Sequence, residues 1–79
     1  MTFTKLDLSG LKCPLPALKT RKALKGISPG DRLEVISTDP LAVIDIPALI
    51  HQTGDRIEII ERIDNRTTFL IEKINGALR

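Results

Sequence analysis

The sequence lacks most of the residue types on which disulfide, metal and base-stacking sites depend. Its 79 residues include one cysteine, Cys13, one histidine, His51, and neither tryptophan nor tyrosine. A lone cysteine cannot form an internal disulfide, and one cysteine with one histidine cannot complete a four-ligand zinc site within a chain. The two phenylalanines, Phe3 and Phe69, are too few for a base-stacking platform. We therefore expect no metal or organic cofactor, so any chemistry of Cys13 must be redox, nucleophilic or intermolecular.

Long apolar runs and a large charge of one sign are also missing. No run approaches the roughly 20 residues that cross a bilayer, and residues 1–5 contain no apolar core of a secretory signal. The net charge is only +2, and the basic residues are scattered among acidic ones. A basic block of the kind that binds nucleic acid is therefore absent. We predict a cytoplasmic protein, a monomer, with no membrane contact and no direct nucleic-acid binding.

What the sequence does contain is a regular succession of short apolar patterns. The length suits one domain over residues 1–79. Apolar residues that alternate with polar ones predict strands, and longer patterns that follow turn-forming residues predict helices. In chain order the predicted elements are a strand over 5–9, a helix over 13–25, a strand over 32–35, a helix over 39–53, and strands over 56–63 and 67–74.

The ends of the two predicted helices have recognisable chemistry. Gly26 stands where a helix often ends with a left-handed residue, and Gly54 should stop the second helix. Asp39 followed by Pro40 is typical of an N-cap and a first helical residue. Pro47 falls inside the second helix, where it removes a backbone hydrogen bond, so we expect a kink or a late start.

The order of strand, helix, strand, helix, strand, strand predicts an α/β two-layer sandwich. Polar residues at outward strand positions, Arg32, Glu34, Arg56 and Glu58, indicate that one sheet face meets water while both helices cover the other. Short crossover connections favour parallel pairing of the first three strands, with the fourth strand antiparallel. The expected sheet is therefore four-stranded and mixed.

The segment Gly10–Pro16 carries the candidate chemistry. If Cys13 is the N-cap of the first helix, then Pro14 is its first residue and Pro16 its third, and neither proline has an N–H to offer. The Leu15 N–H would then be the natural donor to the cysteine sulfur. Such a hydrogen bond would favour a thiolate presented on a stiff turn.

Two further features of this segment would lower the pKa of Cys13. The positive end of the helix dipole and the neighbouring Lys12 both favour the anionic form of the sulfur. The alternative is that Cys13 is a small buried apolar residue, as free cysteines often are. His51 could act as a base toward Cys13, but a surface histidine near a helix end explains it better because no orienting partner is apparent. Solvent accessibility of the sulfur distinguishes the two interpretations of Cys13.

Several segments together resemble the TusA/SirA-like sulfur-carrier family over nearly the whole chain. They are Leu8-Ser9-Gly10-Leu11-Lys12-Cys13-Pro14-Leu15-Pro16, then Arg21-Lys22, Asp39-Pro40 and Asp45-Ile46-Pro47. The resemblance implies a two-layer fold with four strands in the order 1-2-4-3. It also implies that Cys13, in the Cys-Pro-x-Pro motif, receives sulfane sulfur from a cysteine desulfurase and passes it to a relay partner. For members resembling TusA proper, the destination is tRNA thiolation.

Residues around the motif have both functional and ordinary interpretations. Leu15 stands where TusA proper usually has glutamate, which makes the tRNA destination less secure than the carrier chemistry. Arg21 matches a basic position of the family and lies on a helix face with Leu18. It is either a cation near the sulfur or a contact for a partner, or else an arginine that extends to water or pairs locally. Asp45 either orients a basic group near the sulfur or is a solvated helix carboxylate. For Asp39 we prefer capping.

These residues lead to two main functional hypotheses. In the first, the protein is a sulfurtransferase-type carrier in which Cys13 becomes a persulfide, supported by Lys12, Pro14, Leu15, Pro16, Arg21 and Asp45. In the second, it is a non-catalytic binding or regulatory module in which the Cys-Pro-x-Pro segment is only a structural corner. Direct RNA binding is a third, weaker idea, against which the scattered charge argues.

Overall fold

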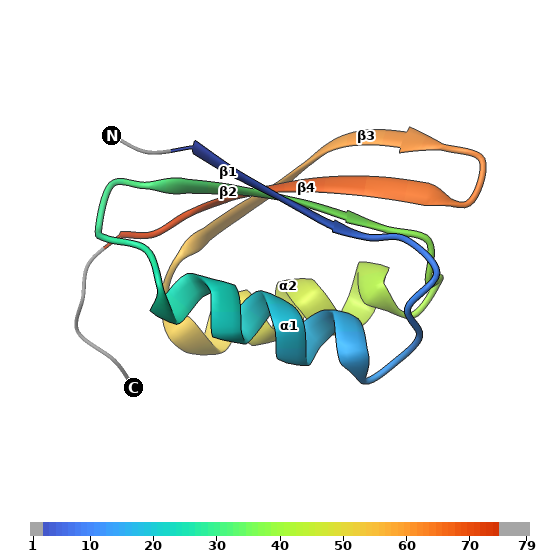
Figure 1. Cartoon of the computed structure of the whole chain (residues 1–79), viewed down its shortest axis with the longest axis horizontal. Coiled ribbons are helices and arrows are strands. Elements are labelled where there is room, and N and C mark those ends of the chain that lie inside the picture. The colour runs from blue at the N-terminus through green and yellow to red at the C-terminus, as the bar shows by residue number, and fades with distance from the viewer. Residues whose placement is uncertain (1–2, 75–79) are drawn as a thin grey trace.

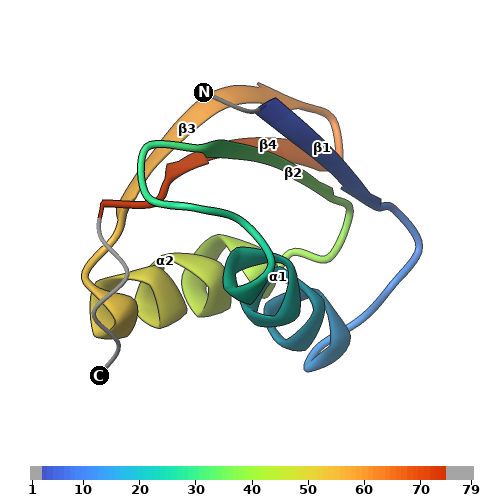
Figure 2. The ribbon, with the colours of Figure 1, turned by 60° about the vertical axis from the view of Figure 1, so that its left-hand side comes forward.

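The structure, a computed structural model, describes residues 3–74 and contains one four-stranded sheet and two helices. The elements are β1 (Phe3–Leu8), α1 (Leu15–Lys25), β2 (Arg32–Ser37), α2 (Ala42–Thr53), β3 (Arg56–Ile63) and β4 (Arg66–Glu72). The sheet order is β1-β2-β4-β3 (Figure 1). Both helices cover the same face of the sheet (Figure 2). The predicted two-layer α/β fold with strand order 1-2-4-3 is confirmed.

The pairing of the third strand differs from the expectation drawn from short crossovers. Only β1 and β2 pair in parallel, whereas β4 lies between β2 and β3 and is antiparallel to both. The expected parallel pairing of the first three strands is therefore wrong for β3. A short turn joins β3 to β4, with Asp64 at φ 53°, and two strands joined so closely pair as an antiparallel hairpin. In the sheet, β4 takes the position next to β2, and β3 lies on the outer side of β4.

The core lies between the sheet and the two helices. Each helix buries every fourth residue along one stripe, Pro16, Thr20 and Leu24 in α1 and Ala42, Ile46 and Ile50 in α2. The buried apolar cluster comprises Leu8, Leu24, Leu33, Val35, Ala42, Ile46, Ile50, Phe69 and Ile71. Burial of a large aliphatic or aromatic side chain contributes about 1.5–3 kcal/mol. The stripes therefore fix how both helices lie against the sheet.

The first helix ends differently from its prediction. Gly26 has φ −91°, so the expected left-handed residue is absent, and its N–H donates to Ala23 O at 3.0 Å. Instead, the buried Lys73 ammonium donates to Leu24 O at 2.7 Å and to Ile27 O at 2.8 Å. A side chain that directly follows β4 thus satisfies one carbonyl in the last turn of α1 and one in the loop just beyond it.

The second helix follows its prediction more closely. Gly54 ends α2 in the left-handed conformation at φ 82°, as predicted, and its N–H donates to Ile50 O. The helix begins at Ala42, later than the predicted start at Asp39-Pro40, and runs through Pro47. Neither helix of the part described, residues 3–74, is long and apolar enough to span a membrane.

The order of the elements brings the two helix starts together. Because β1 and β2 are parallel, their carboxyl ends lie at the same edge of the sheet, and α1 and α2 begin in the loops that follow them (Figure 1). In open α/β sheets this edge is where binding sites usually form. The segment that holds Cys13 lies there.

Candidate functional site

The loop that carries Cys13 is tied to the segment that precedes α2. Gly10 N–H donates to Thr38 Oγ1 at 2.8 Å, and Cys13 N–H donates to Asp39 Oδ2 at 2.6 Å. The other oxygen of Asp39 accepts from Leu41 N–H at 3.1 Å. Asp39 therefore accepts a hydrogen bond just before α2 and holds the backbone of Cys13, but its predicted N-cap position is wrong, because Leu41 is the N-cap and Ala42 the first helical residue. Its contact with Cys13 was not predicted.

The Cys13 thiol is exposed and contacts a side chain of α2. Its Sγ donates a hydrogen bond to Asp45 Oδ2 at 3.0 Å. This hydrogen bond raises the pKa of Cys13, because it stabilises the neutral thiol, and partial desolvation and the negative charges of Asp45 and Asp39 act in the same direction. The interpretation of Cys13 as a buried apolar residue is wrong, since its sulfur reaches solvent.

The predicted N-cap geometry of Cys13 is also wrong. Pro14 is the N-cap of α1, no side chain caps the helix, and Leu15 N–H donates to Lys12 O at 2.9 Å instead of to the sulfur. The expected lowering of the Cys13 pKa fails for the same reason. The sulfur faces a carboxylate 32 residues away in sequence, and the hydrogen bond to that carboxylate raises the pKa of Cys13. Local spacing could not reveal that contact.

Asp45 lies beside the sulfur, but not in either of the two ways predicted from the sequence. Neither orientation of a basic group nor simple solvation describes it, because its carboxylate bonds the thiol directly. Arg21 is exposed on α1, away from the buried stripe, and forms no salt bridge within residues 3–74. Lys12 is exposed beside the cysteine. Of the predicted supporting side chains, the hydrogen bonds bring only Asp45 to the sulfur.

The motif prolines and leucine divide between core and surface. Pro16 is fully buried in the α1 stripe, whereas Pro14 is exposed, and Leu18 N–H donates to the Pro14 carbonyl. Four large apolar side chains near the two helix starts are exposed to 44–67 %: Leu15, Leu18, Leu41 and Ile44. We call these four residues the apolar rim. Sequence reasoning missed the rim because the two helices contribute to it separately.

His51 lies too far along α2 to act on Cys13. It is exposed in the last turn, six residues beyond Asp45, which corresponds to about 9 Å along a helix axis. The cysteine–histidine pair is therefore excluded, and the surface interpretation is confirmed. In the part of the chain from 3 to 74, no three histidine, cysteine, aspartate or glutamate side chains are grouped to hold a metal ion.

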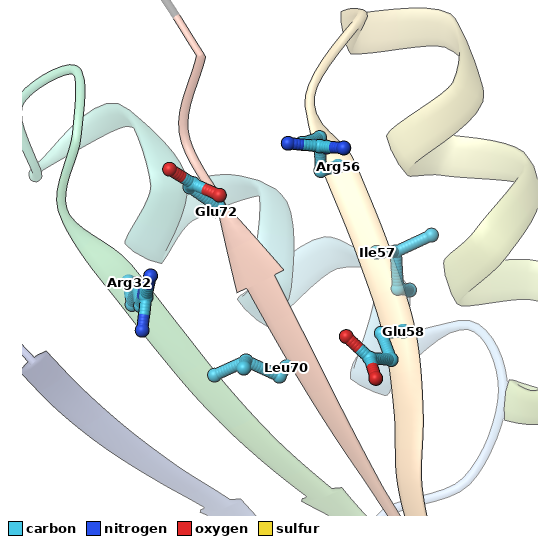
Figure 3. A pocket seen from close by; sticks show the side chains of 6 residues that line it. All are labelled: Arg32, Arg56, Ile57, Glu58, Leu70 and Glu72. Carbon is cyan, nitrogen blue, oxygen red and sulfur yellow. The ribbon is translucent and has the colours of Figure 1, made fainter.

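One surface depression lies away from Cys13, on the open face of the sheet. It has a volume of about 540 Å³ and is lined by Arg32, Arg56, Ile57, Glu58, Leu70 and Glu72 (Figure 3). Arg32, Glu72 and Arg56 are neighbours in register on three adjacent strands. Another depression, of about 390 Å³, is lined by Thr38 and Pro40 beside the Cys13 loop, by Val43 of α2 and by residues of the β3–β4 hairpin.

The fold and an exposed cysteine at the carboxyl edge of the sheet define the class as a small two-layer α/β protein with a presented thiol. A family model described as "Sulfurtransferase TusA" matches residues 4–73. The chain is 44% identical over 68 residues to "Sulfur carrier protein TusA" of Allochromatium vinosum, covering 86% of this chain and 90% of the relative. A protein of the same name from Pseudomonas paraeruginosa is 35% identical, covering 82% of this chain and 80% of that one.

The comparison with solved structures supports the same fold. A SirA-like protein from Desulfitobacterium hafniense superimposes with a TM-score of 0.80, covering 91% of this chain and 99% of the other, at 19% identity. The chain belongs to the TusA family of sulfur carriers. The resemblance noted from the sequence is thereby confirmed.

Proposed function

We propose that this protein carries sulfane sulfur as a persulfide on Cys13, taking it from a cysteine desulfurase and passing it to a relay protein. The observation that supports this most is the exposed thiol at the start of α1 in a chain of the TusA family. Thiol exchange needs an accessible sulfur, and Cys13 meets that condition. No second cysteine exists in the chain to reduce the persulfide and release sulfide early.

The surroundings of Cys13 suit successive docking of two partners. The apolar rim, Leu15, Leu18, Leu41 and Ile44, is exposed at the starts of both helices, where the Cys13 loop also lies, and exposed apolar side chains of this kind are common in protein interfaces. Two exposed cations lie nearby along the chain. Arg21 is on the same side of α1 as Leu18, and Lys12 is next to the cysteine. We propose that the protein works in the cytoplasm, and that tRNA thiolation is one destination of the sulfur.

Intact mass spectrometry tests the carrier function. Incubation with a cysteine desulfurase, its pyridoxal phosphate and free cysteine should add one sulfur atom to the wild-type chain. Reduction with a small thiol should remove that atom. Cys13→Ser is the matched control, because a serine hydroxyl can still donate to Asp45 while it cannot hold a persulfide. Absence of the mass gain in the wild type, or the same gain in Cys13→Ser, would contradict the proposal.

A second candidate is a binding module in which Cys13 only joins the two helix starts. The bond from Cys13 Sγ to Asp45 Oδ2 favours it to some extent, since it links α1 and α2 without any reaction. This hypothesis requires partner binding and cellular activity to survive Cys13→Ser in a folded protein. Loss of activity with partner binding retained would instead support the carrier.

A further inference from the structure

A closed ring of four hydrogen bonds surrounds the Cys13 thiol. Cys13 N–H donates to Asp39 Oδ2 at 2.6 Å, and Leu41 N–H donates to Asp39 Oδ1 at 3.1 Å. Asp45 N–H donates to Leu41 O at 2.9 Å, and Cys13 Sγ donates to Asp45 Oδ2 at 3.0 Å. The ring returns to the residue where it began. Thiol and carboxylate are therefore held together through backbone groups as well as through their own contact.

The core fixes the carboxylate side of this ring. Ile46, next to Asp45, is fully buried, and Ala42 in the preceding turn is nearly so. The backbone of Asp45 is therefore fixed beside the Cys13 loop, so that its short side chain needs only one rotamer to reach the sulfur. Groups held in advance in a reactive geometry contribute more to catalysis than groups that must first be ordered.

The hydrogen bond to Asp45 has two opposing chemical effects on Cys13. It favours the neutral thiol, so the reactive anion is a small fraction at neutral pH, a few per cent even for an ordinary cysteine. It also places a proton acceptor directly on the proton that must leave when the sulfur attacks. A positioned base contributes about 10²–10⁴-fold to such a step. Proton transfer to Asp45 during the attack gives the predominant neutral thiol a route of its own, beside the route through the small population of free thiolate.

We propose that Asp45 is a catalytic base that accepts the Cys13 thiol proton as the sulfur attacks a donor persulfide. This inference rests on the proposed carrier function, which it extends from the nucleophile to the group that removes its proton. The charged groups that face Cys13 are Asp45 on α2 and Asp39 on the segment before it, with Lys12 adjacent on its own loop.

The transfer step balances without an oxidant or a reductant. Cys13 Sγ forms a bond to the outer sulfur of a donor R–S–S–H, and the bond between the two donor sulfurs breaks. The electron pair of that bond goes to the inner sulfur, and the thiol proton of Cys13 passes to Asp45. Asp45 then gives this proton to the leaving R–S⁻. The products are R–S–H and Cys13–S–S–H, and Asp45 is again a carboxylate.

The variant Asp45→Asn, which keeps the size of the side chain, separates the two effects of Asp45. Loss of its suppression of ionisation should raise the rate of thiol attack, whereas loss of the base should lower that rate. The probe is dithiodipyridine, a neutral disulfide that Cys13 can attack whether or not the protein carries sulfur in the cell. The rate follows from the absorbance of the released thiopyridone, and the Cys13 pKa follows from the ultraviolet absorbance of the thiolate. Glu58→Gln, on the exposed outer side of β3, is the matched loss of one carboxylate.

We expect Asp45→Asn to contain more thiolate and yet to react more slowly. Its Cys13 pKa should fall, while its rate at pH 7 should fall about tenfold or more, because the base is lost. The rate of the variant should then rise tenfold per pH unit with the thiolate fraction, whereas the wild-type rate should be nearly flat around neutral pH. Deuterium oxide should slow the wild type at fixed thiolate fraction but not the variant. Glu58→Gln should resemble the wild type.

An equal or faster rate for Asp45→Asn at pH 7 would overturn the proposal, because Asp45 would then only suppress ionisation. If the variant does not fold, the wild type alone still decides. A rate that follows the thiolate fraction with no solvent isotope effect contradicts a base. Failure of the carrier function is a separate outcome, seen when the wild type gains no sulfur mass although its rate with dithiodipyridine is normal.

Discussion

The two ends of α1 are each held by an ionisable side chain from a distant part of the chain, but with opposite consequences. At its start, the exposed Cys13 thiol contacts Asp45, 32 residues away. At its end, the Lys73 ammonium, only 7 % exposed, contacts Leu24 O, 49 residues away, as well as Ile27 O. Burial makes the Lys73 contact structural, because water cannot replace it. Exposure leaves the Cys13 contact free to be exchanged for a partner.

Of the variants that test this comparison between the two ends of α1, Lys73→Met should have the largest effect on stability. Methionine keeps an apolar stem but leaves the carbonyls of Leu24 and Ile27 without their charged donor. Hydrogen bonds to charged groups contribute about 1.5–3 kcal/mol each, so for two bonds we expect the free energy of unfolding to fall by about 3–6 kcal/mol. Urea denaturation measures this change. The rate of Cys13 with dithiodipyridine, measured below the unfolding midpoint, should stay at the wild-type value.

Asp39→Ala should have an intermediate effect on stability, and it should change both the free energy of unfolding and the reactivity of Cys13. The change removes acceptors from Cys13 N–H and Leu41 N–H at the start of α2. Loss of a helix-start acceptor costs about 0.5–2 kcal/mol, so we expect a loss of about 1–2 kcal/mol in unfolding free energy. The thiol rate should change as well, because the ring around Cys13 is opened. Unchanged stability and unchanged reactivity together would show that the ring has no influence.

The pH dependence of stability should give the smallest effect. The folded-state pKa of Cys13 is raised, mainly by the bond to Asp45, so the folded protein holds the thiol proton more tightly than the unfolded chain. The contribution is therefore complete below the unfolded cysteine pKa, about 8.5, and is lost as pH rises through the folded value. Urea midpoints at neutral and alkaline pH should diverge more for the wild type than for Cys13→Ser. A steeper decline in Cys13→Ser would contradict this sign.

The helices and strands could be predicted from the sequence because each is marked by the residues within it and at its ends. Alternation of Leu6 and Leu8 with polar residues, the turn before Arg32 and the glycine at position 54 mark elements by period and backbone freedom. The structure confirms six elements in the predicted order. Strand order 1-2-4-3 was implied by the family resemblance, whereas the crossover argument alone misplaced β3 beside its parallel neighbours.

The sequence by itself determined that Cys13 is the sole sulfur nucleophile of the chain, that two prolines follow it closely, and that helices and strands alternate around it. Only the tertiary structure decided the electrostatic surroundings of that sulfur. A carboxylate from α2 replaces the expected Leu15 N–H as its partner, and the direction of the pKa shift is reversed. The physical reason is that hydrogen bonds act over about 3 Å. Which groups come that close depends on how the two helices pack on the sheet.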